Sequence, residues 1–401
     1  MFIFKAAVVG AGAMGGSIAQ VISFSGLPVV LKDIDQAALD AGMAKARGIY
    51  ESRARKGKMS AGDVEARMAL ITPQLDYSGF DDVDIVIEAV PERIAVKQAV
   101  FRELDGVCHP GAIFASNTSA LSITEMAGAT QRPAQVIGLH FFNPAHVMKL
   151  VEVIPGADTN DDTIESALTF VRDLRKIPVV VKDVPGFLVN RLLAPYAGEA
   201  MYALQEGAAD AETIDGAMVE AGLPMGPFTL LDMTGLDISH DAAEVMAAAY
   251  GERMRPPLLL ARMVAAGRLG QKAGKGFYTY GDETGPTLAD VIAAVQAETG
   301  IRGTPFTADR LLLPMFNEAA RAADEGVAGL TDIGMAVQAG LGFPQGPLEM
   351  ADERGLDEVL AGLEALQATL GDRFAPAPLL VAKVKAGDLG RKTGRGFLEY
   401  T

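Results

Sequence analysis

Short apolar runs, separated by amphipathic stretches, dominate the first part of the chain. Apolar runs of strand length lie at residues 4–9, 27–31, 83–90, 112–116 and 136–139. Runs this short and this uniformly apolar are typical of parallel strands that are buried on both faces. A stretch with helical spacing follows the first run, with Ile18 and Ile22 on one face. The pattern predicts an α/β domain built on a largely parallel sheet.

The region between the second and third apolar runs is expected to form a helical hairpin. Residues 37–50 are rich in alanine and amphipathic, and Ser60 begins a capping pattern for a second helix that runs through Leu70. Beyond Lys182 the spacing of apolar residues becomes helical throughout. The sequence therefore predicts an α/β domain with a helical insertion at about 37–70, followed by an all-α region.

The all-α region repeats itself. Arg191-Leu-Leu-Ala-Pro195 recurs as Arg310-Leu-Leu-Leu-Pro314, and the glycine-rich segment 270–277 recurs at 390–397. These matches indicate one helical unit used twice, joined by a linker around 281–305 that contains a helix-like stretch at 288–298. A tandem pair can pack as the two subunits of a dimer do. We therefore expect the second copy to take the place of a dimer partner.

Composition and charge exclude several classes of function. The 401 residues include 51 acidic and 35 basic side chains, so the formal net charge is −16. This balance argues against a general affinity for nucleic acids or anionic membranes, because both need excess Lys and Arg. The single cysteine, Cys108, allows no internal disulfide and no cysteine-based zinc site, and we expect no bound metal. With no continuous apolar stretch of membrane-spanning length and no convincing signal peptide, the sequence predicts a cytoplasmic protein.

A glycine motif follows the first predicted strand. Gly10, Gly12 and Gly15 form a GxGxxG pattern at the start of a helix, and Asp33 ends the second apolar run. Gly10 permits a tight turn, Gly12 lets the backbone approach a pyrophosphate, and Gly15 lets the helix pack closely on the strand. A carboxylate at Asp33 accepts bonds from a ribose 2′-OH and repels a 2′-phosphate. The context favours an NAD site in a Rossmann-type domain; the alternative is a structural glycine-rich turn.

Polar residues follow the third and fourth strands of this domain. Glu92 and Lys97 come after the run at 83–90, while Asn117 and Ser119 come directly after the run at 112–116. Because ligands of open α/β sheets bind at the carboxyl ends of the strands, these side chains are well placed for a site. Any one of them alone could instead cap a helix.

One of the four histidines stands out. His140 ends the run at 136–139. In the run 149–154 that follows, Glu152 is the only charge after the first residue, Lys149. A turn between the two runs would bring both side chains within reach. A buried carboxylate is costly unless it is paired, and a histidine oriented by a carboxylate is suited to take a hydroxyl proton while a hydride leaves the same carbon. The alternative is a core histidine satisfied by a buried glutamate; His109, His146 and His240 are expected to have structural or surface roles.

Basic residues cluster in the predicted hairpin, against the acidic balance of the whole chain. Six lie within 14 positions, with only Glu51 opposing them: Lys45, Arg47, Arg53, Arg55, Lys56 and Lys58. One interpretation is a solvated helix face. The other is a docking site for a phosphorylated ligand such as coenzyme A.

Taken with these features, the chain resembles the 3-hydroxyacyl-CoA dehydrogenases over nearly its whole length. The resemblance lies in these segments: Gly10-Ala-Gly-Ala-Met-Gly15, Ile87-Glu-Ala-Val90, Ser116-Asn-Thr-Ser119, Gly138-Leu-His-Phe-Phe-Asn-Pro144, Lys149-Leu-Val-Glu-Val153, Pro185-Gly-Phe-Leu-Val-Asn-Arg191, 226–228 and 274–278. The tandem helical unit is similar to the dehydrogenase part of the multifunctional fatty-acid oxidation enzymes. It also occurs in stand-alone bacterial dehydrogenases.

The resemblance implies a reaction: NAD-dependent oxidation of (S)-3-hydroxyacyl-CoA to 3-ketoacyl-CoA, as in fatty-acid β-oxidation. It implies that His140 is the catalytic base and Glu152 its partner. It implies further that Ser119 and Asn190 contact the reacting end of the substrate and that Asn143 lies beside the site. Cofactor contacts are implied for Asp33, Glu92, Lys97 and Asn117. For the basic hairpin, with Arg53, Lys56 and Lys58, it implies the binding of coenzyme A.

The resemblance also shapes the predicted domain plan. We predict an NAD-binding domain at 1–184, a first helical domain at 185–282 and a second, repeated helical domain with its linker at 283–401. No hydratase-like domain precedes residue 1, so hydration of enoyl-CoA is not expected. The second copy has Asp309 where the first has Asn190, and we expect it to hold no active site.

Two other functions stay open at this point. One is dehydrogenation of a free 3-hydroxyacid, although relatives of that kind usually rely on a lysine base. The other is a crystallin-like protein that binds NAD without catalysis. The sequence leaves open the acyl chain length, a distal carboxylate, the pathway and the choice between a monomer with an internal pseudo-dimer and a homodimer.

Overall fold

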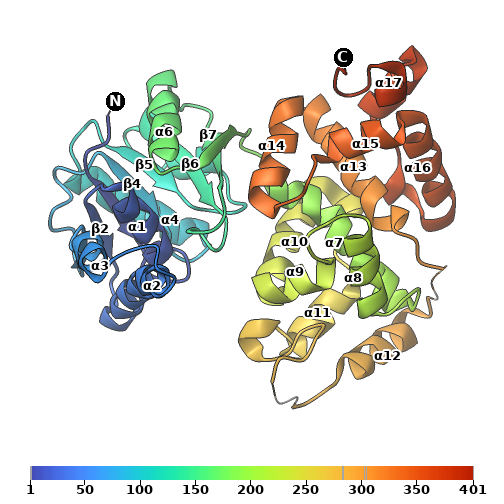
Figure 1. Cartoon of the computed structure of the whole chain (residues 1–401), viewed down its shortest axis with the longest axis horizontal. Coiled ribbons are helices and arrows are strands. Elements are labelled where there is room, and N and C mark those ends of the chain that lie inside the picture. The colour runs from blue at the N-terminus through green and yellow to red at the C-terminus, as the bar shows by residue number, and fades with distance from the viewer. Residues whose placement is uncertain (1, 282–283, 302, 304, 401) are drawn as a thin grey trace. The chain divides into compact units, whose positions relative to one another are not determined.

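The computed structural model describes residues 2–281, 284–301, 303 and 305–400. It divides into two compact units, Met1–Phe187 and Leu188–Thr401. Figure 1 draws the first in blue to green and the second in green to red. The predicted domain boundary at 282/283 includes positions outside the described residues, and the division into three domains stays a prediction.

The first unit is built on an eight-stranded sheet with the order β3-β2-β1-β4-β5-β6-β7-β8. Strands β1 to β6 are parallel, β7 runs antiparallel to β6, and β8 runs parallel to β7. The strands are β1 Ala6–Val9, β2 Val29–Lys32, β3 Ile71–Gln74, β4 Ile85–Glu88, β5 Ile113–Ser116, β6 Val136–Phe141, β7 Leu150–Pro155 and β8 Ile177–Val180. The α/β fold class with a largely parallel sheet is confirmed.

Helices connect the strands of this unit and cover the sheet (Figure 1). They are α1 Gly15–Ser25, α2 Gln36–Arg55, α3 Ala61–Met68, α4 Ile94–Val107, α5 Ile123–Ala127 and α6 Asp161–Asp173, with the short 3₁₀ helix η1 Pro133–Gln135. The core packs Ile18 and Ile22 of α1 against Val8 and Leu31 of the sheet. All four side chains are fully buried, as the uniformly apolar runs predict.

The helical hairpin forms as expected, with shifted ends. Helix α2 continues to Arg55, five residues beyond the predicted end, because nothing between Tyr50 and Arg55 breaks a helix. Ser60 caps α3 in a reciprocal capping box with Asp63. Helix α3 ends at Met68 rather than at Leu70, since the chain turns there into the edge strand β3.

The second unit is helical throughout. Its first copy holds α7 Val189–Glu206, α8 Ala211–Glu220, α9 Pro227–Thr234, α10 Leu236–Tyr250, η2 Gly251–Met254, α11 Leu258–Ala265 and η3 Gln271–Ala273. The linker helix α12 spans Leu288–Thr299, which confirms the predicted stretch. The second copy holds α13 Asp309–Asp324, α14 Leu330–Leu341, α15 Pro347–Arg354, α16 Leu356–Leu370, η4 Asp372–Phe374, α17 Pro378–Ala386 and η5 Arg391–Thr393. The helices of the second copy follow those of the first in the same order (Figure 1).

The two copies meet along α7 and α13, each the first helix of its copy. Arg191 of α7 donates from Nε to Glu318 at 2.7 Å and from Nη1 to Glu325 at 2.8 Å, both on or next to α13. Arg191 is fully buried, so these acids neutralise a charge that would be costly alone.

The reverse contact has the same form. Arg310 of α13 donates from Nε to Glu199 at 3.1 Å and from Nη2 to Glu206 at 2.8 Å, both on α7. Each of these three residues is the repeat counterpart of one in the Arg191 cluster. Reciprocal contacts between equivalent residues are the mark of an isologous, two-fold interface. The copies therefore pack on each other as two subunits of a dimer would.

No helix in the described part of the chain is long and apolar enough to cross a bilayer. The cytoplasmic location stays a prediction.

Candidate active site

His140 and Glu152 face each other across the antiparallel pair β6–β7. The register places them directly opposite, and His140 Nδ1 lies 2.7 Å from Glu152 Oε2. Both side chains are buried, Glu152 completely. A buried carboxylate takes the Nδ1–H bond, which leaves the lone pair of the imidazole on Nε2. The predicted pair is confirmed as a contact, and its free nitrogen is suited to accept a proton.

Two aromatic rings flank this imidazole. The ring centroid of Phe142 lies 4.4 Å from that of His140, and the centroid of Phe187 lies 5.9 Å from it. Phe187 is fully buried, and its backbone has φ of 47°, a left-handed conformation that is uncommon for a bulky residue. Both rings place apolar carbon atoms next to the imidazole.

The ends of β5 and β6 are tied together beside the histidine. Asn117 Oδ1 accepts a hydrogen bond of 2.8 Å from the backbone N–H of Phe141. The backbone N–H of Ser119 donates to Glu92 Oε1 at 2.9 Å. The structure thus places Asn117, Ser119 and Glu92 together at the carboxyl edge of the sheet, as the sequence predicts. Asn143 is exposed in the turn between β6 and β7.

A buried ion cluster supports Glu92 from behind. Lys97 is 1% exposed and donates to Glu88 Oε1 at 2.8 Å and to the carbonyl of Val90 at 3.2 Å, while Glu92 Oε2 lies 3.1 Å from its ammonium. Glu88 is fully buried and also accepts a bond of 2.6 Å from Ser116 Oγ. The ammonium of Lys97 is thus surrounded by acceptors of the protein itself. It acts on the site by holding Glu92 in place.

The ionisation of Glu92 reflects this cluster. Burial raises the pKa of its carboxyl, but the positive charge of Lys97 and hydrogen bonds from Thr118 and Ser119 outweigh burial. The pKa of Glu92 therefore lies below its usual value, and the side chain is a carboxylate at neutral pH.

The loop between β1 and α1 has the shape that a dinucleotide needs. Gly10 has φ of 99°, and a Cβ there would lie 2.6 Å from the carbonyl oxygen of Ala89. A Cβ at Gly15 would lie 1.7 Å from the carbonyl oxygen of Gly10, whereas Gly12 faces open space within 4 Å. No side chain caps the N-terminus of α1. The loop thus leaves backbone N–H groups and room for a pyrophosphate.

Asp33 stands at the end of β2, beside this loop. Its Oδ2 accepts a bond of 2.7 Å from the N–H of Ala11, and its Oδ1 accepts one of 2.7 Å from the N–H of Ile34. These bonds fix the carboxylate next to the glycine turn. The residues present therefore fit NAD, and the contact of Asp33 with the ribose stays a prediction.

Some basic side chains of the hairpin contact other residues of the protein, and others are exposed. Arg47 forms an ion pair with Glu65 of α3, and Arg53 packs its guanidinium 4.5 Å from the centre of the Phe24 ring. Lys56 and Lys58 are exposed after the end of α2, and no ion pair of theirs is found within the described residues. Lys56 and Lys58 are the residues of the predicted set best placed to meet an anion.

A second element shares this positive region. His146 lies in the turn after β6, and burial is the main cause that lowers its pKa. Nearby positive charges lower this pKa further, and they come from Lys176, Lys45, Arg53 and Lys56. Burial lowers the pKa of Lys176 to about 8. Positive charges from α2 and from the start of β8 thus converge on the 144–148 turn, a convergence that the sequence pattern did not predict.

Asn190 belongs to the second unit, near the start of α7. Its counterpart Asp309 begins α13 and pairs with Arg354, whose Nη2 lies 2.7 Å from Asp309 Oδ2. The second copy thus closes this position with an ion pair. The expectation that the second copy holds no active site stays a prediction.

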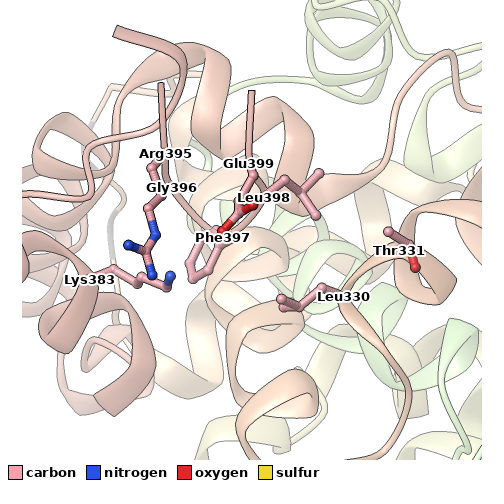
Figure 2. A pocket seen from close by; sticks show the side chains of 8 residues that line it. All are labelled: Leu330, Thr331, Lys383, Arg395, Gly396, Phe397, Leu398 and Glu399. Carbon is pink, nitrogen blue, oxygen red and sulfur yellow. The ribbon is translucent and has the colours of Figure 1, made fainter. Parts of the chain in front are cut away.

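The second copy also contains an open cavity of about 360 Å³, shown in Figure 2. Leu398 lines this cavity, and Tyr278 stands at the matching position of the first copy, where its hydroxyl lies 2.9 Å from Asp215 Oδ2.

Two acidic residues with structural contacts were not singled out by the sequence pattern: Glu88, which is fully buried, and Asp183, which is partly buried. Asp183 accepts bonds from Ser122 Oγ at 3.0 Å and from the backbone N–H of Thr124 at 2.8 Å, which fixes the N-terminus of α5. Among the described residues, no group of three or more His, Cys, Asp or Glu side chains is arranged to hold a metal ion.

Comparisons with known proteins agree with this geometry. Residues 5–184 match the family model described as 3-hydroxyacyl-CoA dehydrogenase, NAD binding domain. Residues 186–280 and 306–400 each match the model of the C-terminal domain of the same family, which confirms the tandem repeat.

The similar proteins include both short and long chains. A fatty acid oxidation complex subunit alpha from Shewanella amazonensis is 39% identical over 399 residues, which cover 96% of this chain and 56% of that protein. The chain thus spans about half the length of this curated relative. The crystal structure of a 3-hydroxybutyryl-CoA dehydrogenase from Escherichia coli is 31% identical, with a TM-score of 0.87, over 96% of this chain and 100% of that one. An (S)-3-hydroxybutyryl-CoA dehydrogenase structure from Ralstonia eutropha is 40% identical, with a TM-score of 0.67, over 70% of this chain and 100% of that one.

Proposed function

We propose, because this chain belongs to the 3-hydroxyacyl-CoA dehydrogenase family, that it oxidises an (S)-3-hydroxyacyl-CoA to the 3-ketoacyl-CoA with NAD. The observation that carries the proposal is the buried His140–Glu152 pair at the carboxyl edge of a dinucleotide-binding sheet. A base with a free lone pair beside such a site is what the oxidation of an alcohol requires.

His140 takes the proton of the 3-hydroxyl group on Nε2 while the C3–H bond breaks. When bound, NAD would supply the acceptor for the hydride that leaves C3. The electron pair of the O–H bond forms the new C=O double bond, so the products are a ketone, NADH and one proton on the imidazole. Glu152 stabilises the imidazolium that forms, and the rings of Phe142 and Phe187 limit the access of water.

Other residues take binding roles in this proposal. Gly10, Gly12 and Gly15 would hold the pyrophosphate of NAD at the N-terminus of α1, and Asp33 would hold its ribose. Glu92, Lys97 and Asn117 complete the cofactor site, with Lys97 acting through Glu92.

The substrate contacts are assigned in the same way. We propose that Ser119 and Asn190 contact the reacting end of the substrate and that Asn143 lies beside it. Arg53, Lys56 and Lys58 bind the phosphates of coenzyme A. The exposure of Lys56 and Lys58 supports this assignment, since a phosphate can reach them.

We infer further that the chain is a monomer with an internal pseudo-dimer. The reciprocal Arg191 and Arg310 clusters support this, because they use on one chain the face that a two-fold dimer would use on two.

Consumption of NADH by the purified protein tests the activity, with acetoacetyl-CoA in one reaction and free acetoacetate in the other. We expect turnover with the CoA ester alone. Turnover of free acetoacetate at an equal rate would contradict the assignment of an acyl-CoA substrate, and a protein that binds NADH but turns over neither compound nor longer 3-ketoacyl-CoA esters would contradict the enzyme assignment.

A further inference from the structure

Glu88 is a buried carboxylate at the end of β4, and it holds three parts of the chain together. Its Oε1 accepts hydrogen bonds from the backbone N–H of Val90 at 2.7 Å and from the ammonium of Lys97 at 2.8 Å. Its Oε2 accepts from Lys97 at 3.1 Å and from the hydroxyl of Ser116 at 2.6 Å. Glu88 is fully buried, so these donors offset the cost of a charge that water does not reach.

These contacts continue into a closed ring that passes through Glu92. Ser116 Oγ accepts a bond of 3.2 Å from the backbone N–H of Thr118, whose hydroxyl donates to Glu92 Oε1. Glu92 Oε2 lies 3.1 Å from the ammonium of Lys97, which returns the ring to Glu88. The side chain of Glu92 is 44% exposed, whereas the other four members are buried. Glu92 is therefore the member of the ring that a ligand reaches most readily.

The ring shares one ammonium between two carboxylates. With Glu88 in place, Lys97 is neutralised from the core side. Glu92 Oε1 then stays bonded to Thr118 and to the backbone N–H of Ser119, the latter at 2.9 Å. Without the charge on Glu88, the buried ammonium would draw on Glu92 alone, because a buried charge that lacks a partner is costly. The carboxylate of Glu92 would then move away from the end of β5.

We propose that Glu88 is a positioning residue of the cofactor site, which fixes the carboxylate of Glu92 through Lys97 and through Ser116. This inference rests on the proposed function, which gives Glu92 a contact with NAD. The buried pair of His140 spans β6 and β7, two strands that carry no member of the ring. Loss of the charge on Glu88 should therefore weaken the binding of the cofactor more than it slows the chemical step.

The test is the Kd of NADH, measured by fluorescence titration, in wild type and in Glu88→Gln, which keeps the shape of the side chain and removes its charge. We expect the Kd to rise about tenfold, the effect of one hydrogen bond to a charged group, while kcat at saturating NADH changes less than about threefold. In Glu92→Ala, the additional change Glu88→Gln should raise the Kd less than about twofold, because Glu88 acts through Glu92.

Helix α4, which carries Lys97 near its start, provides the matched control near its end. Asp105 pairs with Arg132 Nε at 2.7 Å, and both side chains are 15% exposed. Asp105→Asn should lower the free energy of unfolding, as Glu88→Gln does, and leave the Kd of NADH at the wild-type value. If Glu88→Gln does not fold, Ser116→Ala opens the same ring without removing a charge, and it should raise the Kd about threefold.

The wild-type Kd in folded Glu88→Gln, or in Ser116→Ala where that variant replaces it, would overturn this inference. So would an effect of Glu88→Gln that is as large in the Glu92→Ala background as in wild type. Because the test measures binding, a wild type that binds NADH but turns over no CoA ester would overturn the proposed activity and leave this inference standing. A wild type that binds no NADH would overturn both.

Discussion

The two helical copies share one fold and differ in what their surfaces can do. Both keep the buried aspartate that accepts backbone bonds from the C-terminal loop: Asp232 accepts from Phe277, and Asp352 accepts from Phe397, each at 2.8 Å. Both also keep the arginine that crosses to the other copy. The residues around Asn190, however, are replaced by charged residues that pair with one another.

The comparison of the two copies distinguishes residues that are kept for folding and packing from residues that are kept for ligand binding. Residues that hold a copy together, or that join the copies, stay the same because each copy needs them to fold and pack. Residues at the positions that we propose to face the substrate are free to change in the second copy, which we expect to bind no substrate. On this proposal, the second copy serves as a structural partner of the first.

Substitutions at the interface between α7 and α13 should have the largest effect on the free energy of unfolding. Arg310→Ala leaves Glu206 and part of Glu199 without a partner, both buried, and should lower the free energy of unfolding by about 3–5 kcal/mol. Arg191→Ala should cost less, since its partner Glu325 is half-exposed. Urea titrations of both variants measure these changes. A loss below about 1 kcal/mol for Arg310→Ala would show that the interface is not a unit of stability.

Substitution of Asn190 should lower the enzyme's activity, whereas substitution of its counterpart Asp309 in the second copy should not. We expect Asn190→Ala to lower kcat/KM by about 10²-fold, the effect of losing one well-placed hydrogen-bonding group. Asp309→Asn, at the matching position of the second copy, should leave kcat/KM unchanged. Steady-state assays of both variants decide the point, and equal losses in the two would mean that the second copy also takes part in catalysis.

A smaller effect concerns acid stability. The hydrogen bond from Arg191 holds the pKa of Glu325 below its usual value, although burial raises it. A carboxyl with a lower pKa in the folded state stabilises the fold above its unfolded pKa of about 4.3, and this contribution is lost as the pH falls through the folded value. Because Glu325 is half-exposed, Glu325→Gln should cost only about 0.5 kcal/mol at pH 7 and nothing at pH 2. Unfolding curves at the two pH values check this; an equal cost at both would exclude the charge as the cause.

The sequence predicted those features of the fold and site that depend on a short stretch of neighbouring residues. The central strands appear as apolar runs because both faces of these strands are buried. The pairing of His140 with Glu152 could be inferred because a lone charge in an apolar strand needs a partner and only a short turn separates the two. The roles of Ser119 and Asn190 stay predictions.

The rest depended on contacts that local patterns do not contain. The edge strand β3 includes Pro73 and buries only Ile71, so it has no apolar signal. Glu88 is also a charged residue within an apolar run, but its partners Lys97 and Ser116 come from a helix and from another strand. The sequence showed the charge and not the cluster; the cofactor contact that the resemblance implies for Lys97 stays a prediction.

The most direct test of the account is the turnover number of His140→Ala with acetoacetyl-CoA and NADH, measured beside the affinity of the same variant for NADH. We propose His140 as the acid–base group on the strength of its buried pair with Glu152, so we expect kcat to fall by about 10²–10⁴-fold while NADH binds as in wild type. A variant that keeps the wild-type kcat would contradict the assignment.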